Sequence, residues 1–335
     1  MGPLLASSTG AAPIAIAGTP DGKRFLLTSN VAHGSSPAVT LAWLVHVDGG
    51  DASISDPVEI PFAGQPAFDG SGFVVIGGTA TGLALQRVAL DGTLVGSPAQ
   101  RIATTEWTAV TSVVAAPTGV AVAWTAWPGD PHTAPTVEAH AALLAADAAT
   151  THDTLLDSAP NHPDPNFGTV FAPTQLFVLQ GRVVARHGAP NALTVTDLGW
   201  SGEPSASTRL PSDLTDAPFS MFVAGDRLMY ASKGALFAGV PGGPFTEVAT
   251  VDAVAGASDA CGRTVLLANG TGQGLPWGPP IVEPLGGSPA QLPLPGPRGS
   301  SPGPTSVASI DNGFGVAWLD QQPPGSLQFA ALTWQ

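Results

Sequence analysis

The sequence predicts a single all-β domain, and three observations support that prediction. The apolar residues come in runs of about four to eight, which is strand length, and none is long enough to span a bilayer. With 41 Gly and 34 Pro among 335 residues, long helices have little room. One unit (strand, tight turn, very apolar strand, loop and two further strands) recurs about every 35–50 residues. Together these observations predict a β-propeller.

Seven tight turns mark the repeat, and each holds Gly, Asn or Asp where a hairpin needs a positive φ. The turns lie at Pro20–Lys23, Asp69–Gly72, Pro117–Gly119, Gln180–Arg182, Gly225–Arg227, Cys261–Arg263 and Asp311–Gly313. A short apolar second strand is expected after each turn, over Arg24–Ser29, Phe73–Gly77, Val120–Thr125, Val183–His187, Leu228–Ser232, Thr264–Ala268 and Phe314–Leu319. Neighbouring blades would cover both faces of such strands.

Third strands are visible in six of the units. They are expected over Val39–Val47, Leu83–Leu90, Val137–Leu144, Ala192–Leu198, Gly234–Val240 and Leu327–Thr333. Asp-Gly pairs at Asp48-Gly49 and Asp91-Gly92 then turn the chain into a fourth strand.

The repeat predicts one propeller domain over residues 1–335, with seven blades. The blades are expected at about 12–61, 64–104, 107–158, 165–211, 216–250, 251–295 and 303–335. The last unit has no outer strand before Gln335, and Pro3–Ser8 is a spare segment at the start. Pairing that segment with the last blade would remove two free sheet edges and close the ring. Six or eight blades, or a pair of β-sandwiches, are the competing folds.

The charge and cysteine content exclude several classes of partner. The net charge is −14, whereas nucleic-acid binding needs a Lys/Arg footprint. Lys23 and Lys233 are the only lysines, so an anionic membrane is a poor partner and no membrane insertion is expected. The single Cys261 excludes an intrachain disulfide and a multi-cysteine metal site. The Lys-poor, Ala/Thr/Pro/Gly-rich composition predicts an exported bacterial protein, extracellular, periplasmic or in the cell envelope, whose native signal segment has been removed. A monomer is also expected.

Three local motifs resemble known propeller families. Thr19–Phe25 reads Thr-Pro-Asp-Gly-Lys-Arg-Phe and resembles the Pro-Asp-Gly-Lys blade motif of TolB-like propellers. The stretch Ala67–Thr93 resembles a repeat of large secreted bacterial propeller proteins, although it lacks the Trp that those repeats often carry in the second strand. Ser309–Gly313 resembles the start of the sialidase Asp-box without its Thr-Trp ending. These resemblances imply a propeller of secreted bacterial type, and none carries an activity.

One face of the predicted ring, built by loops between second and third strands and by blade connectors, collects the polar candidates. Four of the seven histidines map to this loop face: His33, His132, His162 and His187. The candidates are densest at blades three and four, where they comprise Asp130, His132, His162, Asp164, Arg186 and His187. The other histidines, His46, His140 and His152, map to third or fourth strands, where a half-exposed position without a role is expected.

Three functions compete for this cluster. A noncatalytic propeller would bind a protein or glycan there, and its expected contacts are Trp107, Trp127, Trp277, His33 and Asp320. A polysaccharide lyase or hydrolase would use acid–base chemistry from His132, His162, His187, Arg186, Asp130 and Asp164. A metal site for Zn²⁺ or Cu²⁺ would use His132, His162 and His187 with Asp130 or Asp164. Because no metal motif, nucleophile elbow or phosphate loop occurs, the binding module without a cofactor is the prediction.

Overall fold

The computed structural model describes most of the chain, and every regular element in the described part is a β-strand. The described residues are 14–31, 38–48, 51–80, 82–104, 106–116, 119–129, 133–145, 150–161, 173–189, 192–199, 201–210, 220–232, 235–250, 255–259, 263–268, 281–284, 302–320 and 326–333. In these ranges there is no helix of the length and apolarity that a membrane crossing requires.

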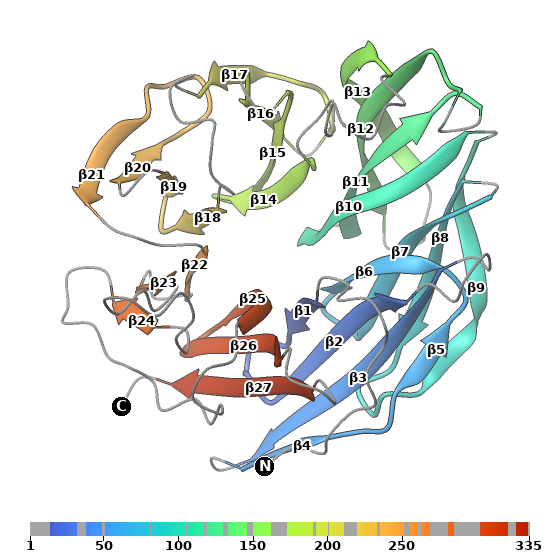
Figure 1. Ribbon diagram of the computed structural model, residues 1–335, viewed down its shortest axis with the longest axis vertical. Helices are drawn as coiled ribbons and strands as arrows, with labels where there is room; N and C mark the ends of the chain where they lie inside the picture. Colours follow the sequence, from blue (N-terminus) through green and yellow to red (C-terminus); the bar gives the residue numbers. More distant parts are fainter. Residues whose placement is uncertain are drawn as a thin grey trace.

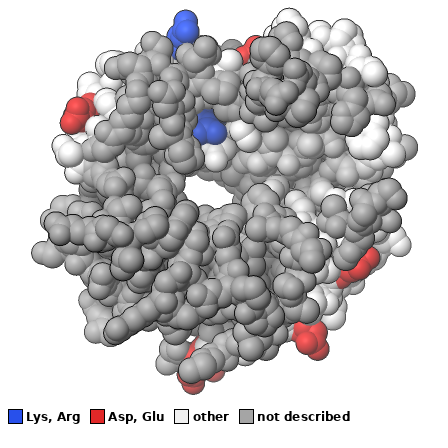
Figure 2. Space-filling model, in the orientation of Figure 1, with Lys and Arg blue, Asp and Glu red and all other residues white. Residues whose placement is uncertain are grey.

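The strands form seven antiparallel sheets arranged in a ring, and the space-filling view shows an opening at its centre (Figures 1 and 2). The first strand of each sheet lies nearest the centre. These inner strands contact one another in order around the ring, β1, β6, β10, β14, β18, β22 and β25, and β25 contacts β1 again. A closed ring of radial antiparallel sheets is a β-propeller. The predicted all-β propeller fold is therefore confirmed.

The first four sheets each hold at least four strands. The first contains β1 (Ile14–Gly18), β2 (Arg24–Val31), β3 (Val39–Asp48), β4 (Asp51–Ile54) and β5 (Val58–Ile60), with β4 and β5 both paired to β3. The second contains β6 (Ala63–Phe68), β7 (Phe73–Thr79), β8 (Gly82–Val88) and β9 (Leu94–Ala103). The third contains β10 (Trp107–Ala116), β11 (Gly119–Trp127), β12 (Thr136–Ala145) and β13 (Thr150–Pro160). The fourth contains β14 (Gln175–Leu179), β15 (Arg182–His187), β16 (Thr194–Gly199) and β17 (Ala206–Arg209).

In the described part of the chain the fifth sheet has four strands, and the sixth and seventh have three strands each. The fifth contains β18 (Ser220–Ala224), β19 (Arg227–Ser232), β20 (Ala235–Gly239) and β21 (Thr246–Thr250). The sixth contains β22 (Ala255–Ser258), β23 (Thr264–Ala268) and β24 (Ile281–Pro284), and the seventh β25 (Pro302–Ile310), β26 (Gly313–Asp320) and β27 (Ser326–Thr333). The closing segment Pro3–Ser8 lies outside the described residues. Seven complete blades closed by that segment therefore stay a prediction.

The tight turns have the backbone that their residues predict. Positive φ occurs at six of the seven turns, at Gly22, Gly70, Gly119, Gly181, Gly225 and Gly313, and the remaining turn lies outside the described residues. Aspartates stabilise several of them from within, as where Asp69 accepts hydrogen bonds from the backbone N–H groups of Ser71 and Gly72 at 2.9 and 3.0 Å. The predicted second strands agree with β2, β7, β11, β15, β19, β23 and β26 to within about two residues at each end.

The first and seventh sheets pack directly on each other, so the two ends of the described chain meet. A shared core joins Phe25 and Leu27 of β2 to Ala317 of β26 and Leu327 of β27. Small residues allow the approach: a Cβ added at Gly315 would lie 2.3 Å from the Phe25 ring. The backbone N–H of Asp311 also donates to the carbonyl oxygen of Pro20 at 2.7 Å. This contact closes the ring independently of any residue before Ile14.

Candidate functional site

The third sheet has two chemically different faces, and strand β11 sets them. Successive side chains of a strand point to opposite faces of the sheet. The large residues Val120, Val122 and Trp124 pack against the second sheet. The small residues Ala121 and Ala123 pack against the fourth sheet. One histidine lies against each face: His140 on the face toward the second sheet and His187 on the face toward the fourth sheet.

His140, on β12, lies on the face toward the second sheet. It is directly opposite Trp124 in the β11–β12 register, and the two rings stack with centroids 5.1 Å apart and an interplanar angle of 12°. Glu138 precedes it by two residues and therefore shares its face. The His140 Nε2 lies 3.1 Å from Glu138 Oε2. The predicted third-strand position of His140 is confirmed, and its side chain is 14% exposed and is held by charged partners.

Two further carboxylates complete this group. Asp153 of β13 lies 3.1 Å from His140 Nδ1 through its Oδ1. It reaches the same face because the β12–β13 register shifts between Ala139 and His140, a bulge that re-aims the side chains of β13. Glu106 lies just before β10, and a carboxylate oxygen of Glu106, one of Glu138 and a His140 nitrogen all lie within 4.8 Å of one another. We call Glu106, Glu138, His140 and Asp153 the carboxylate–histidine cluster.

The carboxylates determine the ionisation of His140. Burial lowers the pKa of the imidazole, but the hydrogen bonds and negative charges of Asp153 and Glu138 outweigh burial, so the pKa lies above the ordinary value of 6.5. Among the described residues, His140 is the one basic partner that forms an ion pair with Glu138 or with Asp153. The cluster therefore carries more negative than positive charge even when the imidazole is protonated.

His187, at the end of β15, lies on the junction between the third and fourth sheets. Its side chain is buried, and Nε2 lies 2.9 Å from the Thr196 hydroxyl, which is in turn 2.9 Å from the Ser207 hydroxyl. Asp157 of β13 is farther away, with Oδ2 3.9 Å from Nδ1, beyond hydrogen-bond distance. Burial therefore dominates and lowers the pKa of His187 below 6.5, against the opposing effect of Asp157.

The order Asp157–His187–Thr196 resembles an acid–base–nucleophile series, but the hydroxyl is not accessible. Thr196 is 3% exposed and its oxygen already contacts Ser207. A substrate carbonyl could not approach it without opening the sheet. The geometry fits a structural hydrogen-bond chain across β15, β16 and β17.

Arg186 points to the opposite side of the fourth sheet from His187. Its strand neighbour Val184 packs with the core shared with the fifth sheet, whereas Ala185 packs toward the third. The Arg186 Nη2 donates to the carbonyl oxygen of Pro173 at 3.1 Å. Burial lowers the pKa of its guanidinium to about 10. The structure thus does not bring Arg186 and His187 into one pocket, although they are adjacent in the sequence.

Two tryptophans lie at the loop-face end of the third sheet. Trp107 begins β10 and Trp127 ends β11, and the register places them directly opposite each other. The structure places both at strand ends. Cross-strand partners share a face, and by the alternation of β11 this is the face toward the fourth sheet. Trp107 is 62% exposed.

The remaining predicted contacts are only partly placed. His33, Asp130, His132, His162, Asp164 and Trp277 lie outside the described residues, and Asp320 ends β26 in the seventh sheet. Of the predicted candidates, Trp107, Trp127 and His187 come to one junction, between the third and fourth sheets. The carboxylate–histidine cluster was not predicted. A signal for part of it was present, since Glu138-Ala-His140 in an alternating strand places two metal- or proton-binding groups on one face.

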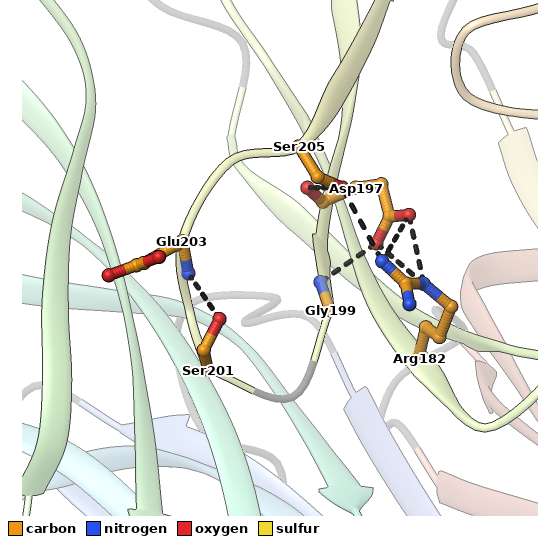
Figure 3. Close-up of polar contacts among 6 residues, drawn as sticks. All are labelled: Arg182, Asp197, Gly199, Ser201, Glu203 and Ser205. Atoms are coloured by element: carbon orange, nitrogen blue, oxygen red, sulfur yellow. Dashed lines mark hydrogen bonds and ion pairs between the residues drawn. The ribbon is translucent and has the colours of Figure 1, made fainter.

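A charged group at the other end of the fourth sheet has a structural role (Figure 3). Arg182 forms an ion pair with Asp197, with Nη2 2.8 Å from Oδ2. Asp197 also accepts the backbone N–H of Gly199 at 2.7 Å and its carbonyl accepts the Ser205 hydroxyl at 3.3 Å. These bonds hold the turn between β16 and β17.

On the face seen in Figure 2, charged side chains of the described residues are few and scattered, although one basic side chain borders the central opening.

Comparisons with known proteins identify the fold. No family model matches the chain, and no curated protein matches its sequence. Solved structures do match: the WD40 domain of Pan2 from Neurospora crassa has a TM-score of 0.56 at 10% identity, over 100% of this chain and 95% of that one. The β-propeller domain of Cps50 (Swd1) from Myceliophteria thermophila has a TM-score of 0.52 at 10% identity, covering 98% of both chains. An oligogalacturonate lyase from Vibrio parahaemolyticus has a TM-score of 0.50 at 12% identity, over 98% and 92%. At such identities the likeness shows the propeller fold alone.

Proposed function

We propose that this chain is a noncatalytic binding propeller, exported or associated with the cell envelope, that holds a protein or glycan at the loop face of the third and fourth sheets. The observation that carries the proposal is the Trp107–Trp127 pair. An indole that is 62% exposed at a strand end adds nothing to the core, yet offers a flat apolar surface with one N–H donor. Indoles of this kind stack on sugar rings and anchor protein partners.

The neighbouring junction supports the same location. His187 and Asp157 line the contact between the third and fourth sheets, on the face that Trp107 and Trp127 share. Propellers place their ligand sites at loop ends, where inter-blade junctions are open to solvent. The proposed contact surface therefore starts at Trp107 and continues toward the fourth sheet.

A lyase or hydrolase is the weaker reading of the described residues. Arg186 and His187 would have to act together, and they lie on opposite faces of β15. The likeness to the oligogalacturonate lyase gives the fold and not the chemistry, because unrelated functions share propellers.

A glycan array, followed by titration of the strongest glycan against the full chain, tests the proposal. Trp107→Ala should weaken binding of that glycan by at least about ten-fold, because removing a stacking anchor costs more than ~1 kcal/mol. Val248→Ala is the matched control, since Val248 is also an exposed apolar side chain but lies on β21 of the fifth sheet. Equal affinity of wild type and Trp107→Ala for the bound glycan would reject the proposed surface. If the array is blank, the same two variants are compared for retention of a crosslinked protein partner.

A further inference from the structure

The carboxylate–histidine cluster has the donor atoms of a transition-metal site. Imidazole nitrogen and carboxylate oxygen are the ligands that Zn²⁺ accepts alongside thiolate, at about 2.0–2.2 Å. Tetrahedral ligands at that distance are about 3.4 Å apart. The His140 Nε2–Glu138 Oε2 separation of 3.1 Å is close to this value, and a Glu106 oxygen lies within 4.8 Å of one His140 nitrogen and one Glu138 oxygen. A flexible Glu side chain can cover the remaining gap without moving a strand.

Asp153 gives His140 the orientation that a metal ligand needs. A ligating histidine usually donates its other ring N–H to a carboxylate, which fixes the tautomer and the ring plane. Asp153 Oδ1 lies 3.1 Å from Nδ1, so Asp153 can hold a proton on Nδ1 and leave Nε2, on the Glu138 side of the ring, for the metal. Stacking on Trp124 fixes the ring from the other side.

Charge also favours a cation here. Three carboxylates share one imidazole, and the described residues supply Glu138 and Asp153 with no other ion-pair partner. The side chains of His140 and Glu138 are only 14% and 25% exposed, so water screens this charge incompletely. A divalent ion bound between these side chains would offset this negative charge.

The imidazole selects among divalent ions. Ca²⁺ and Mg²⁺ prefer sets made only of oxygen, whereas one nitrogen with two carboxylates suits Zn²⁺. Three protein ligands leave a fourth position for water, as in zinc sites that are not purely structural. We propose that Glu106, Glu138 and His140 bind one Zn²⁺ ion, with Asp153 as the positioning carboxylate. This proposal goes beyond the binding function and does not depend on it.

Calorimetric titration of Zn²⁺ into chelator-treated full chain tests the proposal. Wild type should bind one Zn²⁺ per chain, and Ca²⁺ should not compete. Glu106→Gln and Glu138→Gln keep the side-chain volume but each remove a ligand charge, so each should weaken Zn²⁺ binding by more than about ten-fold. Asp153→Asn should weaken it by about ten- to a hundred-fold through the orientation of His140. Glu247→Gln, which removes the same charge at an exposed position of β21, should bind as wild type does.

A measurement without variants covers the case in which a substitution disturbs folding. In NMR spectra of the wild type, added Zn²⁺ should shift the imidazole signals of His140 and leave those of His187 in place. Absence of a stoichiometric Zn²⁺ ion would overturn the proposal. So would unchanged affinity in both Glu→Gln variants, or a shift of His187 in place of His140.

Discussion

The two faces of the third sheet bury one histidine each and give them opposite properties. Toward the second sheet, His140 is flanked by Glu138 and Asp153 and its pKa is raised. Toward the fourth sheet, His187 contacts a neutral hydroxyl, has its carboxylate 3.9 Å away, and its pKa is lowered. Both side chains are largely buried, so burial alone does not set the direction of the pKa shift. The distance from the imidazole to a carboxylate sets it.

The same contrast runs through the packing. Strand β11 presents Val, Val and Trp to the second sheet and alanines to the fourth. The small face brings the fourth sheet close, and its polar contacts are short hydroxyl bonds. The exposed Trp107 and its cross-strand partner Trp127 lie at one end of this face.

The largest loss of stability is expected from removing Trp124, the largest of the β11 side chains that face the second sheet. Trp124→Ala should lower the free energy of unfolding by about 3–5 kcal/mol, because it leaves a cavity in the core shared with the second sheet. Guanidinium unfolding followed by circular dichroism measures this loss. Trp107→Ala removes the same side chain from an exposed site and should cost less than about 0.5 kcal/mol. Similar losses in both variants would contradict the assignment of one tryptophan to the core and the other to the surface.

A larger side chain on the face of β11 toward the fourth sheet should cause an intermediate loss of stability. Ala123 is fully buried against the fourth sheet, so Ala123→Leu should cost about 1–3 kcal/mol through strain. Ala109→Leu, at an exposed position of β10, serves as the control in the same denaturant series. A neutral or stabilising Ala123→Leu would show that the junction between the third and fourth sheets is loosely packed.

The smallest effect is a difference in pH dependence. His187 has a folded-state pKa below 6.5, so the stability gained by keeping it neutral is present above pH 6.5 and is lost as the pH falls below 6.5 toward the folded-state pKa. The slope from one such group reaches at most about 1.4 kcal/mol per pH unit. His187→Gln should flatten the stability curve of the protein below pH 6.5. An unchanged or steeper curve would mean that Asp157 keeps His187 charged in the folded state.

The ring follows from local sequence signals, and this explains why so much of the fold was predictable. Asp-Gly and Gly-Arg turns need positive φ, and apolar strands covered on both sides follow them, so both are visible in single short segments. Strand β24 was missed because Ile281–Pro284 lies between prolines and reads as loop. Within the described residues β24 is an edge strand that pairs with β23 alone, and proline is tolerated in such a position.

The site was harder to predict because it depends on contacts between separate strands. The pairing of Glu138 with His140 follows from alternation alone, but Asp153 joins them only through a register shift that no local pattern reveals. Alternation also separates Arg186 from His187, although their adjacency in the chain suggested one site. Strand assignment from turns was sound, whereas grouping residues by loop proximity ignored the faces to which they point.

The difference between the two faces is tested most directly by crystals of the full chain soaked with Zn²⁺ and measured at the zinc absorption edge. We expect one anomalous peak about 2.0–2.2 Å from His140 Nε2, with Glu138 and Glu106 as its other ligands, and none at His187. A peak at His187, or no peak at the carboxylate–histidine cluster, would contradict it.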